Sequence, residues 1–242
     1  MHFDQAGFEI RCEWGLRGLR ELAPISDVVI IVDVLSFCTA LDVGTSRGAT
    51  IFPYPFKGDS AAAYAASVNA QLANADRGAG PSLSPASLWG AEPGVRLMLP
   101  SPNGSALSFA AKHRNVLAAC LRNATAAAAL AGSLGSTIAV IPAGETWDSG
   151  ELRPSVEDLV GAGAVIASLP GRKSPEAQLA VAVFECVRTN LAETLRECGS
   201  GRELIERGFG ADVELAAEFE VSSNVPVLEG RAFSRPGTER AR

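Results

Sequence analysis

The sequence has few of the residues on which metal-binding and thiol chemistry often depend. Only two of its 242 residues are histidine, and its five cysteines are widely spaced and odd in number. No Cys-x-x-Cys pair is present, so neither a cysteine zinc site nor a redox dithiol is indicated. Cys38 and Cys120 lie near candidate loops, but a thiol nucleophile needs an activating base and neither histidine is near them in sequence. We therefore expect reduced, mostly buried cysteines and no covalent cysteine catalysis.

Long apolar runs and an excess of positive charge are also missing. No segment approaches the roughly 20 apolar residues that span a bilayer, and residues 1–5 lack the basic region and apolar core of a signal peptide. The formal net charge is −6, whereas a nucleic-acid surface normally carries a basic stripe. We therefore predict a cytoplasmic protein with no membrane or nucleic-acid partner, in which an anionic substrate needs a local positive site or a metal.

What the sequence does contain is a run of five β-branched apolar residues, Val28–Val32, that leads directly into Asp33. Such a run is typical of a strand buried on both faces, and open α/β sheets bind ligands at the carboxyl ends of their strands. A carboxylate held there suits a magnesium ligand or a general base. An aspartate that caps a helix or bonds a loop fits the same position.

Strand-like and helix-like segments alternate along the chain, which predicts an α/β fold with three α/β/α layers and a largely parallel or mixed central sheet. We expect residues 1–170 to form the α/β core, 171–234 a helical C-terminal portion packed on it, and 235–242 a disordered tail. Residues 76–94 are rich in Gly, Pro and Ser and predict a long loop, a feature that is often functional. A twofold homodimer is the expected assembly on frequency alone. The predicted strands cover residues 8–14, 28–32, 49–54, 95–99, 116–119 and 137–141, and the predicted helices 16–22, 36–46, 61–72, 106–112, 123–134, 154–169, 175–198 and two within 201–219.

The segment Ser101-Pro102-Asn103-Gly104-Ser105 follows one predicted strand and precedes a helix. The backbone amides of Gly104 and Ser105 would point out of the helix N-terminus, where phosphate or sulfonate is favoured. An ordinary turn with Ser105 as N-cap fits equally well. It is not a Walker loop, because Gly-x-x-x-x-Gly-Lys is absent.

Arg122 and Asn123 stand at the start of the next predicted helix. An asparagine at this position is by default an N-cap. A guanidinium beside a helix N-terminus makes a bidentate anion clamp, which is the functional interpretation of Arg122, although a solvated or salt-bridged arginine is the commoner case.

Five acids lie within fourteen positions, beginning directly after the strand predicted at 137–141. Two of them, Glu157 and Asp158, are adjacent and would differ by about 100° around a helix. We therefore expect one in the site and the other in a structural role. A solvated acidic helix start is the simpler alternative. The five acids are Glu145, Asp148, Glu151, Glu157 and Asp158.

Taken in order, these motifs resemble those of the 2-phosphosulfolactate phosphatase family, over about residues 28–230. Each motif is weak alone, but their order and spacing together are specific. The matching segments are Val32-Asp33-Val34-Leu35, Asn103-Gly104-Ser105, Asn123-Ala124, Ala143-Gly144-Glu145, Val156-Glu157-Asp158 with Gly161 and Gly163, Gly201-Arg202-Glu203-Leu204-Ile205 and Val225-Pro226-Val227.

The resemblance implies an α/β phosphatase that uses Mg²⁺ to convert 2-phosphosulfolactate, or a similar phosphorylated small acid, to the free 2-hydroxy acid, a step of coenzyme M synthesis. Three groups of site residues follow from the motifs and the resemblance. We expect catalytic roles for Asp33, Glu145 and Asn123; substrate or phosphate binding by Ser101, Asn103, Gly104, Ser105 and Arg122; and a metal held by Asp33, Glu157 and Asp158.

The chain departs from the family pattern at two places. Ser36-Phe37 stands where the family usually has an arginine after Asp-Val-Leu, which points to a less anionic substrate, and Ser82-Leu83-Ser84-Pro85 replaces a Gly-Asn-Ser-Pro-like motif. A non-catalytic small-anion binding protein of the same fold is therefore the main alternative. A nucleotide-binding enzyme is disfavoured because no Gly-x-Gly-x-x-Gly follows a strand. No Asp-x-Asp motif follows the buried strand, which favours direct attack by water over attack by Asp33.

Overall fold

Strand β2 (Val28–Val32) is buried along its whole length in the computed structural model, which describes residues 3–236. It pairs in parallel with β7 (Ile138–Pro142) on one side and with β6 (Val116–Ala119) on the other. Alternate residues of β2 face two separate hydrophobic cores. The predicted strand buried on both faces is confirmed, and the burial of both faces explains why its residues do not alternate with polar ones.

The described residues form a sheet of nine strands in the order β1-β7-β2-β6-β10-β11-β3-β5-β4. Two parallel sets, β1-β7-β2-β6 and β3-β5-β4, are joined by the antiparallel hairpin β10–β11 from the C-terminal region. The predicted largely parallel sheet is confirmed. The hairpin was not predicted, because its strands are only three residues long. The remaining strands of this sheet are β1 (Ile10–Cys12), β3 (Thr50–Tyr54), β4 (Gln71–Leu72), β5 (Arg96–Pro100), β10 (Val227–Glu229) and β11 (Ala232–Ser234).

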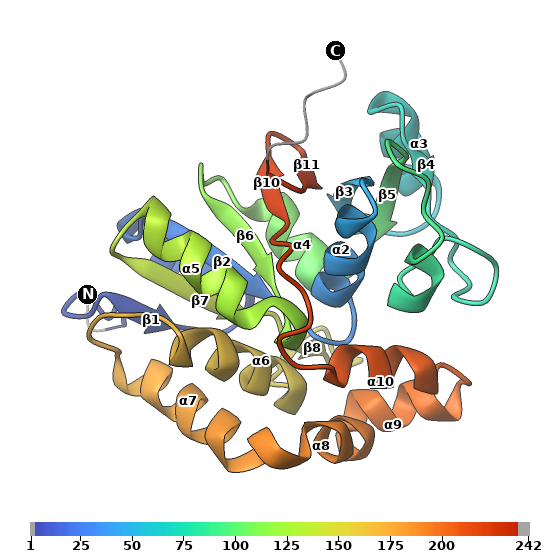
Figure 1. Ribbon diagram of the computed structural model, residues 1–242. Helices are drawn as coiled ribbons and strands as arrows, with labels where there is room; N and C mark the ends of the chain where they lie inside the picture. The colour runs from blue at the N-terminus through green and yellow to red at the C-terminus, as the bar shows by residue number, and fades with distance from the viewer. Residues whose placement is uncertain (1–2, 237–242) are drawn as a thin grey trace.

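Helices cover both faces of the sheet (Figure 1), as the three-layer prediction required. One core receives α1 (Gly15–Leu22), α2 (Phe37–Ser46) and α4 (Gly104–Ala110). The opposite core receives α5 (Ala124–Leu134), α6 (Val156–Ala167) and α7 (Pro175–Val187). Short 3-10 turns complete these connections, at η1 (Ala23–Ile25), η2 (Pro85–Leu88), η3 (Leu121–Asn123) and η4 (Arg188–Asn190), and α3 (Asp59–Ser67) packs near the β4 edge.

The predicted helical C-terminal portion is confirmed, and it shares the core on the α5–α7 face of the sheet. The single helix expected over 175–198 is divided into α7, η4 and α8 (Leu191–Glu197). Two shorter helices follow, α9 (Gly199–Glu206) and α10 (Gly210–Ala217), as the glycines at 208 and 210 indicated. Most of the tail predicted to be disordered, residues 237–242, lies outside the described residues.

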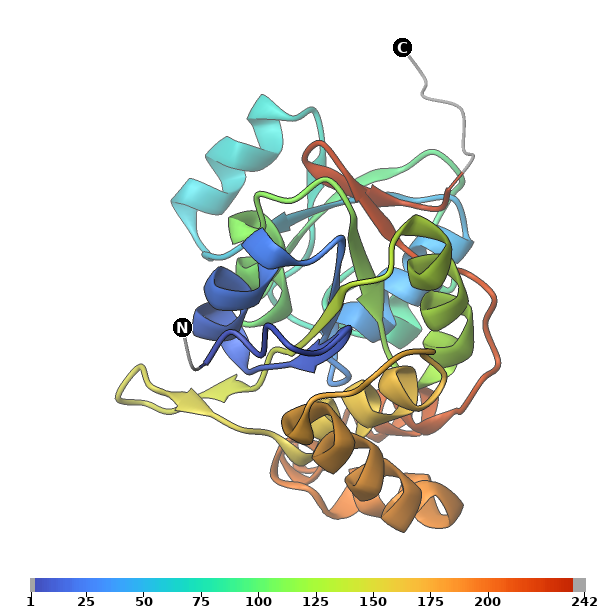
Figure 2. The same ribbon diagram turned by 90° about the vertical axis from the view of Figure 1, so that its left-hand side faces the viewer.

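Two glycines of α6 allow this helix to approach its neighbours closely. A Cβ on Gly163 would lie 2.0 Å from the carbonyl oxygen of Ala180 in α7, and a Cβ on Gly161 would lie 2.6 Å from a methyl group of Val34. The helix therefore presses against both α7 and the turn after β2. Figure 2 shows a small separate hairpin, β8 (Glu145–Thr146) with β9 (Leu152–Arg153), projecting from the body of the molecule just before α6.

Within residues 3–236, no helix combines the length and apolar character that crossing a bilayer requires.

Candidate active site

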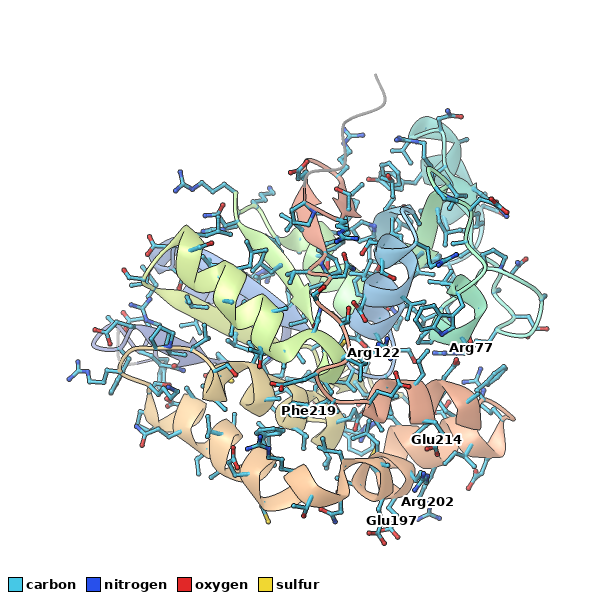
Figure 3. The ribbon with its side chains drawn as sticks, viewed as in Figure 1. Arg77, Arg122, Glu197, Arg202, Glu214 and Phe219 are labelled. Atoms are coloured by element: carbon cyan, nitrogen blue, oxygen red, sulfur yellow. The ribbon has the colours of Figure 1, made fainter. Side chains whose placement is uncertain are left out.

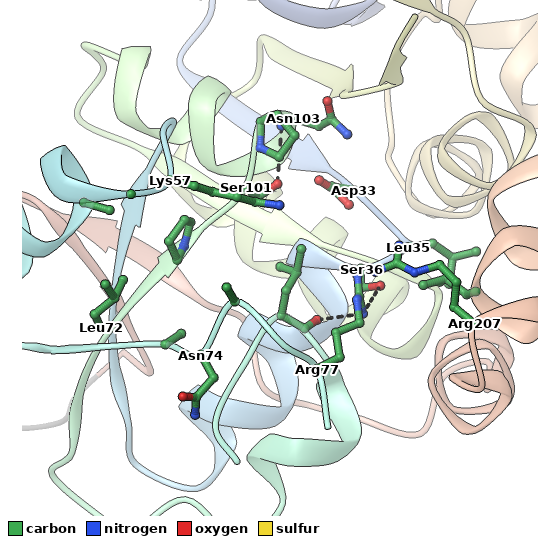
Figure 4. A pocket seen from close by; sticks show the side chains of 18 of the residues that line it. Asp33, Leu35, Ser36, Lys57, Leu72, Asn74, Arg77, Ser101, Asn103 and Arg207 are labelled. Atoms are coloured by element: carbon green, nitrogen blue, oxygen red, sulfur yellow. Dashed lines mark hydrogen bonds between the residues drawn. The ribbon is translucent and has the colours of Figure 1, made fainter. Parts of the chain in front are cut away.

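A cavity of about 500 Å³ lies where β2 and β5 end (Figure 4). Its wall combines the turn after β2, the loop after β5, the start of β8, the N-terminal part of α3, the segment around β4 and one face of α9. Four residues that the sequence predicted for the site line it together: Asp33, Ser101, Asn103 and Glu145. They come from three strand ends, so the sheet topology brings together side chains that are up to 112 positions apart.

The carboxylate of Asp33 is held in one orientation by two backbone amides. Its Oδ1 accepts a hydrogen bond from the Phe37 N–H at 3.0 Å, and its Oδ2 accepts one from the Gly104 N–H at 2.8 Å. A Cβ on Gly104 would lie 2.6 Å from this Oδ2, so the close approach requires glycine. Asp33 thus ties the start of α2 to the start of α4, and only 4% of the residue is exposed.

Glu145 forms a second polar group at the cavity. Its Oε2 accepts a hydrogen bond from the Asn103 side-chain amide at 2.7 Å, and the Thr146 hydroxyl donates to the Asn103 Oδ1 at 3.2 Å. The amide of Asn103 is therefore fixed between β8 and the loop after β5. The backbone N–H of Asn103 also donates to the Ser101 hydroxyl oxygen at 3.3 Å, which closes the turn.

Burial shifts both cavity carboxyls toward the protonated form. It raises the pKa of Asp33 to about 6, with a smaller contribution from the charge of Glu157, while the Phe37 and Gly104 amides act in the opposite direction. Burial also raises the pKa of Glu145 to about 7, assisted by the charge of Asp33 and opposed by the hydrogen bond from Asn103. A carboxyl group with a pKa near 7 can accept and return a proton at neutral pH.

The structure does not bring Asp33, Glu157 and Asp158 together as the predicted metal ligands. Asp158 accepts hydrogen bonds from the Val34 N–H at 2.7 Å and the Gly144 N–H at 2.8 Å, so it joins the turns after β2 and β7. Neither Glu157 nor Asp158 lines the cavity, although both are buried. Burial and the charge of Asp33 raise the pKa of Asp158. Among the described residues, no three His, Cys, Asp or Glu side chains form a group able to hold a metal.

Arg122 and Asn123 lie away from the cavity and serve the fold. The Nε of Arg122 donates to Asp42 at 2.9 Å, and its Nη1 donates to Glu218, so the guanidinium is engaged by two carboxylates rather than open to a substrate. The Oδ1 of Asn123 accepts from the Cys120 N–H at 2.9 Å, and its amide donates to the Asn224 carbonyl at 2.9 Å. The salt-bridged interpretation of Arg122 describes its contacts. Asn123 precedes α5, but its side chain does not cap that helix as expected; it accepts from the Cys120 N–H at the start of η3 instead.

Gly104 and Ser105 also lie behind the cavity wall. The Gly104 N–H is used by Asp33 and is not available to a phosphate. The Ser105 hydroxyl donates to the Leu99 carbonyl at 2.7 Å and accepts from the Tyr54 N–H at 3.0 Å. Of the predicted phosphate-binding turn, Ser101 and Asn103 therefore face the cavity, while Gly104 and Ser105 position the turn against β3, β5 and Asp33.

Three basic side chains that the sequence analysis did not assign line the same cavity: Lys57, Arg77 and Arg207. Arg77 lies at the start of the long loop at 76–94, whose length was the one available signal. Arg207 follows α9, beyond the Gly201-Arg202-Glu203 segment that was noted only as part of a motif. Nothing in the local sequence separates these residues from the other lysines and arginines of the chain.

Comparison with known proteins gives a consistent result. A family model described as 2-phosphosulpholactate phosphatase matches residues 18–231. A probable 2-phosphosulfolactate phosphatase of Carboxydothermus hydrogenoformans is 33% identical over 144 residues, which cover 57% of this chain and 58% of that protein. A 2-phosphosulfolactate phosphatase of Methanothermobacter thermautotrophicus is 30% identical over 136 residues, covering 56% and 57%. The matched region thus spans less than two thirds of these relatives.

Proposed function

The chain belongs to the 2-phosphosulpholactate phosphatase family, and from this membership we propose that it is a phosphoric monoester hydrolase. Its substrate is the phosphate ester of a small anionic 2-hydroxy acid, 2-phosphosulfolactate or a close analogue. The proposal extends to this chain the activity that is named for its two relatives. It also agrees with the resemblance in the order of the motifs.

The observation that supports the proposal most is the charge arrangement of the cavity. Asp33 and Glu145 lie beside the polar turn at Ser101 and Asn103, whereas Arg77 and Arg207 belong to other parts of the wall (Figure 4). A site that takes a phosphate ester and a second acid group needs cationic side chains for the anions and carboxylates for proton transfer and metal binding. The cavity offers both.

The oxygen donors at the cavity fit a magnesium ion. Mg²⁺ is commonly bound through one or two carboxylates, with water and substrate phosphate oxygens filling the other positions. Neither Asp33 nor Glu145 forms an ion pair within residues 3–236, and Asp33 is held rigidly by two amides. Asp33 would hold the ion, which would neutralise the charge that develops on the phosphate.

In the proposed reaction, a water oxygen attacks phosphorus and the bond from phosphorus to the ester oxygen breaks. Glu145 accepts the proton of the attacking water, and the departing alkoxide takes a proton from solvent water to become the free hydroxyl; the hydroxide left in solvent then removes the proton from Glu145. Asn103 orients Glu145 through their hydrogen bond. Each Asp33 oxygen already accepts a backbone N–H, which favours a holding role over nucleophilic attack.

The test is phosphate release from 2-phosphosulfolactate and a panel of other phosphorylated 2-hydroxy acids, with Mg²⁺ present. We expect Glu145→Gln to lower kcat by about 10²–10⁴-fold, the usual range for acid–base groups. Asp33→Asn should lower kcat at least about tenfold, because it removes the carboxylate charge that would hold the ion. Asp148→Asn is the matched control, because Asp148 is exposed in the loop that joins β8 and β9, and it should retain the wild-type rate. An unchanged rate in both site variants would reject these assignments.

Absence of turnover on the whole panel would favour the non-catalytic alternative. In that case, calorimetric titration with the same acids separates an anion-binding protein, which binds them, from one with another ligand. The twofold homodimer and the cytoplasmic location stay predictions, which sedimentation equilibrium and cell fractionation would test.

A further inference from the structure

Arg77 is built into the cavity wall more firmly than an ordinary loop arginine. Its side chain is only 10% exposed, although it lies on a long connection between β4 and η2. A single nitrogen, Nη1, donates to the Ser36 hydroxyl at 3.2 Å, to the Leu83 carbonyl at 3.2 Å and to Asp212 Oδ2 at 3.1 Å. These contacts fix one corner of the guanidinium between the turn after β2 and helix α10.

The other donors of Arg77 are left available. Within residues 3–236, neither Nε nor Nη2 has a hydrogen-bond partner. The guanidinium carries five N–H donors in a rigid plane and pairs with oxyanions through two parallel hydrogen bonds. A nearly buried arginine with its free edge at a cavity is therefore a receptor for an oxyanion.

The surroundings of Arg77 favour an anion over further protein contacts. Asp212, its carboxylate partner, is shared with the Ser84 hydroxyl at 2.6 Å and the Ala86 N–H at 3.3 Å, so part of its negative charge is taken by other donors. Arg207 lies near the same place, because the guanidinium carbons of Arg77 and Arg207 are 5.9 Å and 5.7 Å from the ring centre of Phe209. Arg207 donates to Glu203, which also lines the cavity, at 2.9 Å, so the donors that stay available to an anion at this end are mainly those of Arg77.

We propose that Arg77, positioned by Ser36 and Asp212, binds the second strong-acid group of the substrate, a sulfonate, at the end of the cavity away from Asn103. The assignment rests on the proposed function. In Figure 4, Asp33, Ser101 and Asn103 lie in the upper part of the cavity, and Arg77 with its bond to Ser36 lies in the lower part. The phosphate, on the middle carbon of the substrate, would thus lie toward Asp33 and Asn103, and the sulfonate on the neighbouring carbon toward Arg77.

A structural role for Arg77 is the competing explanation, and substrate preference distinguishes the two. The experiment compares kcat/KM for 2-phosphosulfolactate with that for 2-phospholactate, which lacks the sulfonate. We expect the wild-type protein to prefer the sulfonate substrate by at least about tenfold, the effect of one good charged hydrogen-bond pair. In Arg77→Met, the preference should fall to within about twofold, mainly through a higher KM for 2-phosphosulfolactate.

Arg202→Met is the matched control, since Arg202 is exposed on α9 and does not line the cavity. It should keep the wild-type preference. Arg77→Lys covers the case in which Arg77→Met folds poorly, because lysine can still pair with Asp212 but lacks the second planar donor edge; it should also lose most of the preference. Equal losses on both substrates, or an unchanged preference, would overturn the proposal.

A binding measurement keeps this test independent of turnover. Sulfoacetate, a sulfonate without phosphate, is titrated calorimetrically into the wild-type and variant proteins. We expect at least about tenfold weaker binding in Arg77→Met than in the wild type, and no change in Arg202→Met. If the protein hydrolyses no phosphate ester but shows this pattern, the proposed function fails and the anion site stands. If it hydrolyses the ester but binds sulfoacetate equally in all variants, the anion site fails alone.

Discussion

The molecule contains two buried arginine–aspartate pairs that both contact α10, and they differ in what surrounds them. Arg122 pairs with Asp42 and Arg77 pairs with Asp212, at 2.9 Å and 3.1 Å, and each arginine side chain is at most 10% exposed. Figure 3 places both arginines beside α10, to which Asp212 and the Leu215 carbonyl bonded by Arg122 belong. Distance and burial are therefore similar in the two pairs.

What separates them is the number of donors that the protein itself uses. Two nitrogens of Arg122 meet carboxylates, and Asp42 accepts a further bond from the Ser222 hydroxyl at 2.6 Å. That pair is closed and joins η3 to α2 and to the segment before β10. The Arg77 pair engages one nitrogen and faces the cavity. A buried arginine is thus a candidate for ligand binding only when its free edge meets a cavity.

The largest expected difference between the two arginine–aspartate pairs is in the free energy of unfolding. Arg122→Met leaves Asp42 buried without its cation, which costs about 3–5 kcal/mol in free energy of unfolding. Arg77→Met leaves Asp212 still bonded to Ser84 and Ala86, so the loss should be at most about half as large. Urea denaturation of both variants measures the difference.

The control for that measurement is Arg47→Met, which removes an exposed arginine at the end of α2 and should leave the denaturation midpoint unchanged. Equal losses for Arg122→Met and Arg77→Met would mean that both pairs serve the fold alone.

The same two arginines mark what the sequence could and could not predict about the site. Asp33, Ser101, Asn103 and Glu145 were placed together correctly, because each follows a strand whose apolar pattern is local and parallel strands end at a common edge. The local sequence supported a role in anion binding for Arg122 equally well, because Arg122 stands beside a predicted helix start. Its partner Asp42 is 80 positions away in sequence, and no local sequence pattern predicts such a pair.

Arg77 was missed for the complementary reason. Its place at the cavity depends on the path of a long loop and on α10, whose Asp212 is 135 positions further along the chain. The fold was easier to predict, since hydrophobic periodicity is repeated along each element. The hairpin β10–β11 was not predicted, because strands of three residues are too short to show that periodicity.

The second prediction concerns Gly104, which lies behind the cavity wall and holds Asp33 in place. Gly104→Ala introduces a Cβ that would lie 2.6 Å from Asp33 Oδ2 and 2.6 Å from the Phe37 ring. We expect a loss of about 1–3 kcal/mol from overpacking, together with a fall in kcat because Asp33 is displaced. Gly132→Ala is the matched control: its Cβ meets nothing within 4 Å in α5, so it should be neutral or stabilising. Wild-type activity in Gly104→Ala would show that the residues around Asp33 can shift to accept the added methyl group while Asp33 keeps its function.

The pH dependence of stability sharpens the contrast between paired and unpaired carboxylates. Asp42 and Asp212 have cation partners, whereas burial raises the pKa of Asp33 from 3.8 to about 6 and that of Glu145 from 4.5 to about 7. Between about pH 4 and 7 the folded protein therefore binds more protons than the unfolded chain, and the free energy of unfolding falls as the pH rises. We expect a decrease of about 2 kcal/mol from pH 6 to pH 8 in chelator-treated protein. The slope should flatten in the Asp33→Asn, Glu145→Gln double variant; an unchanged slope would assign it to other groups.

The smallest expected effect comes from an ion pair with shorter contacts than either buried one. Arg196 donates to both oxygens of Glu214 at 2.5 Å and 2.6 Å, but the two side chains are 47% and 52% exposed. Water and salt screen such a pair, and ordering two long side chains opposes it. Arg196→Ala should therefore leave the urea midpoint within the error of the measurement at 0.15 M salt, whereas Arg122→Met shifts it strongly. A comparable shift in Arg196→Ala would mean that the contact distance of an ion pair, rather than the burial of its carboxylate, decides how much an arginine stabilises this fold.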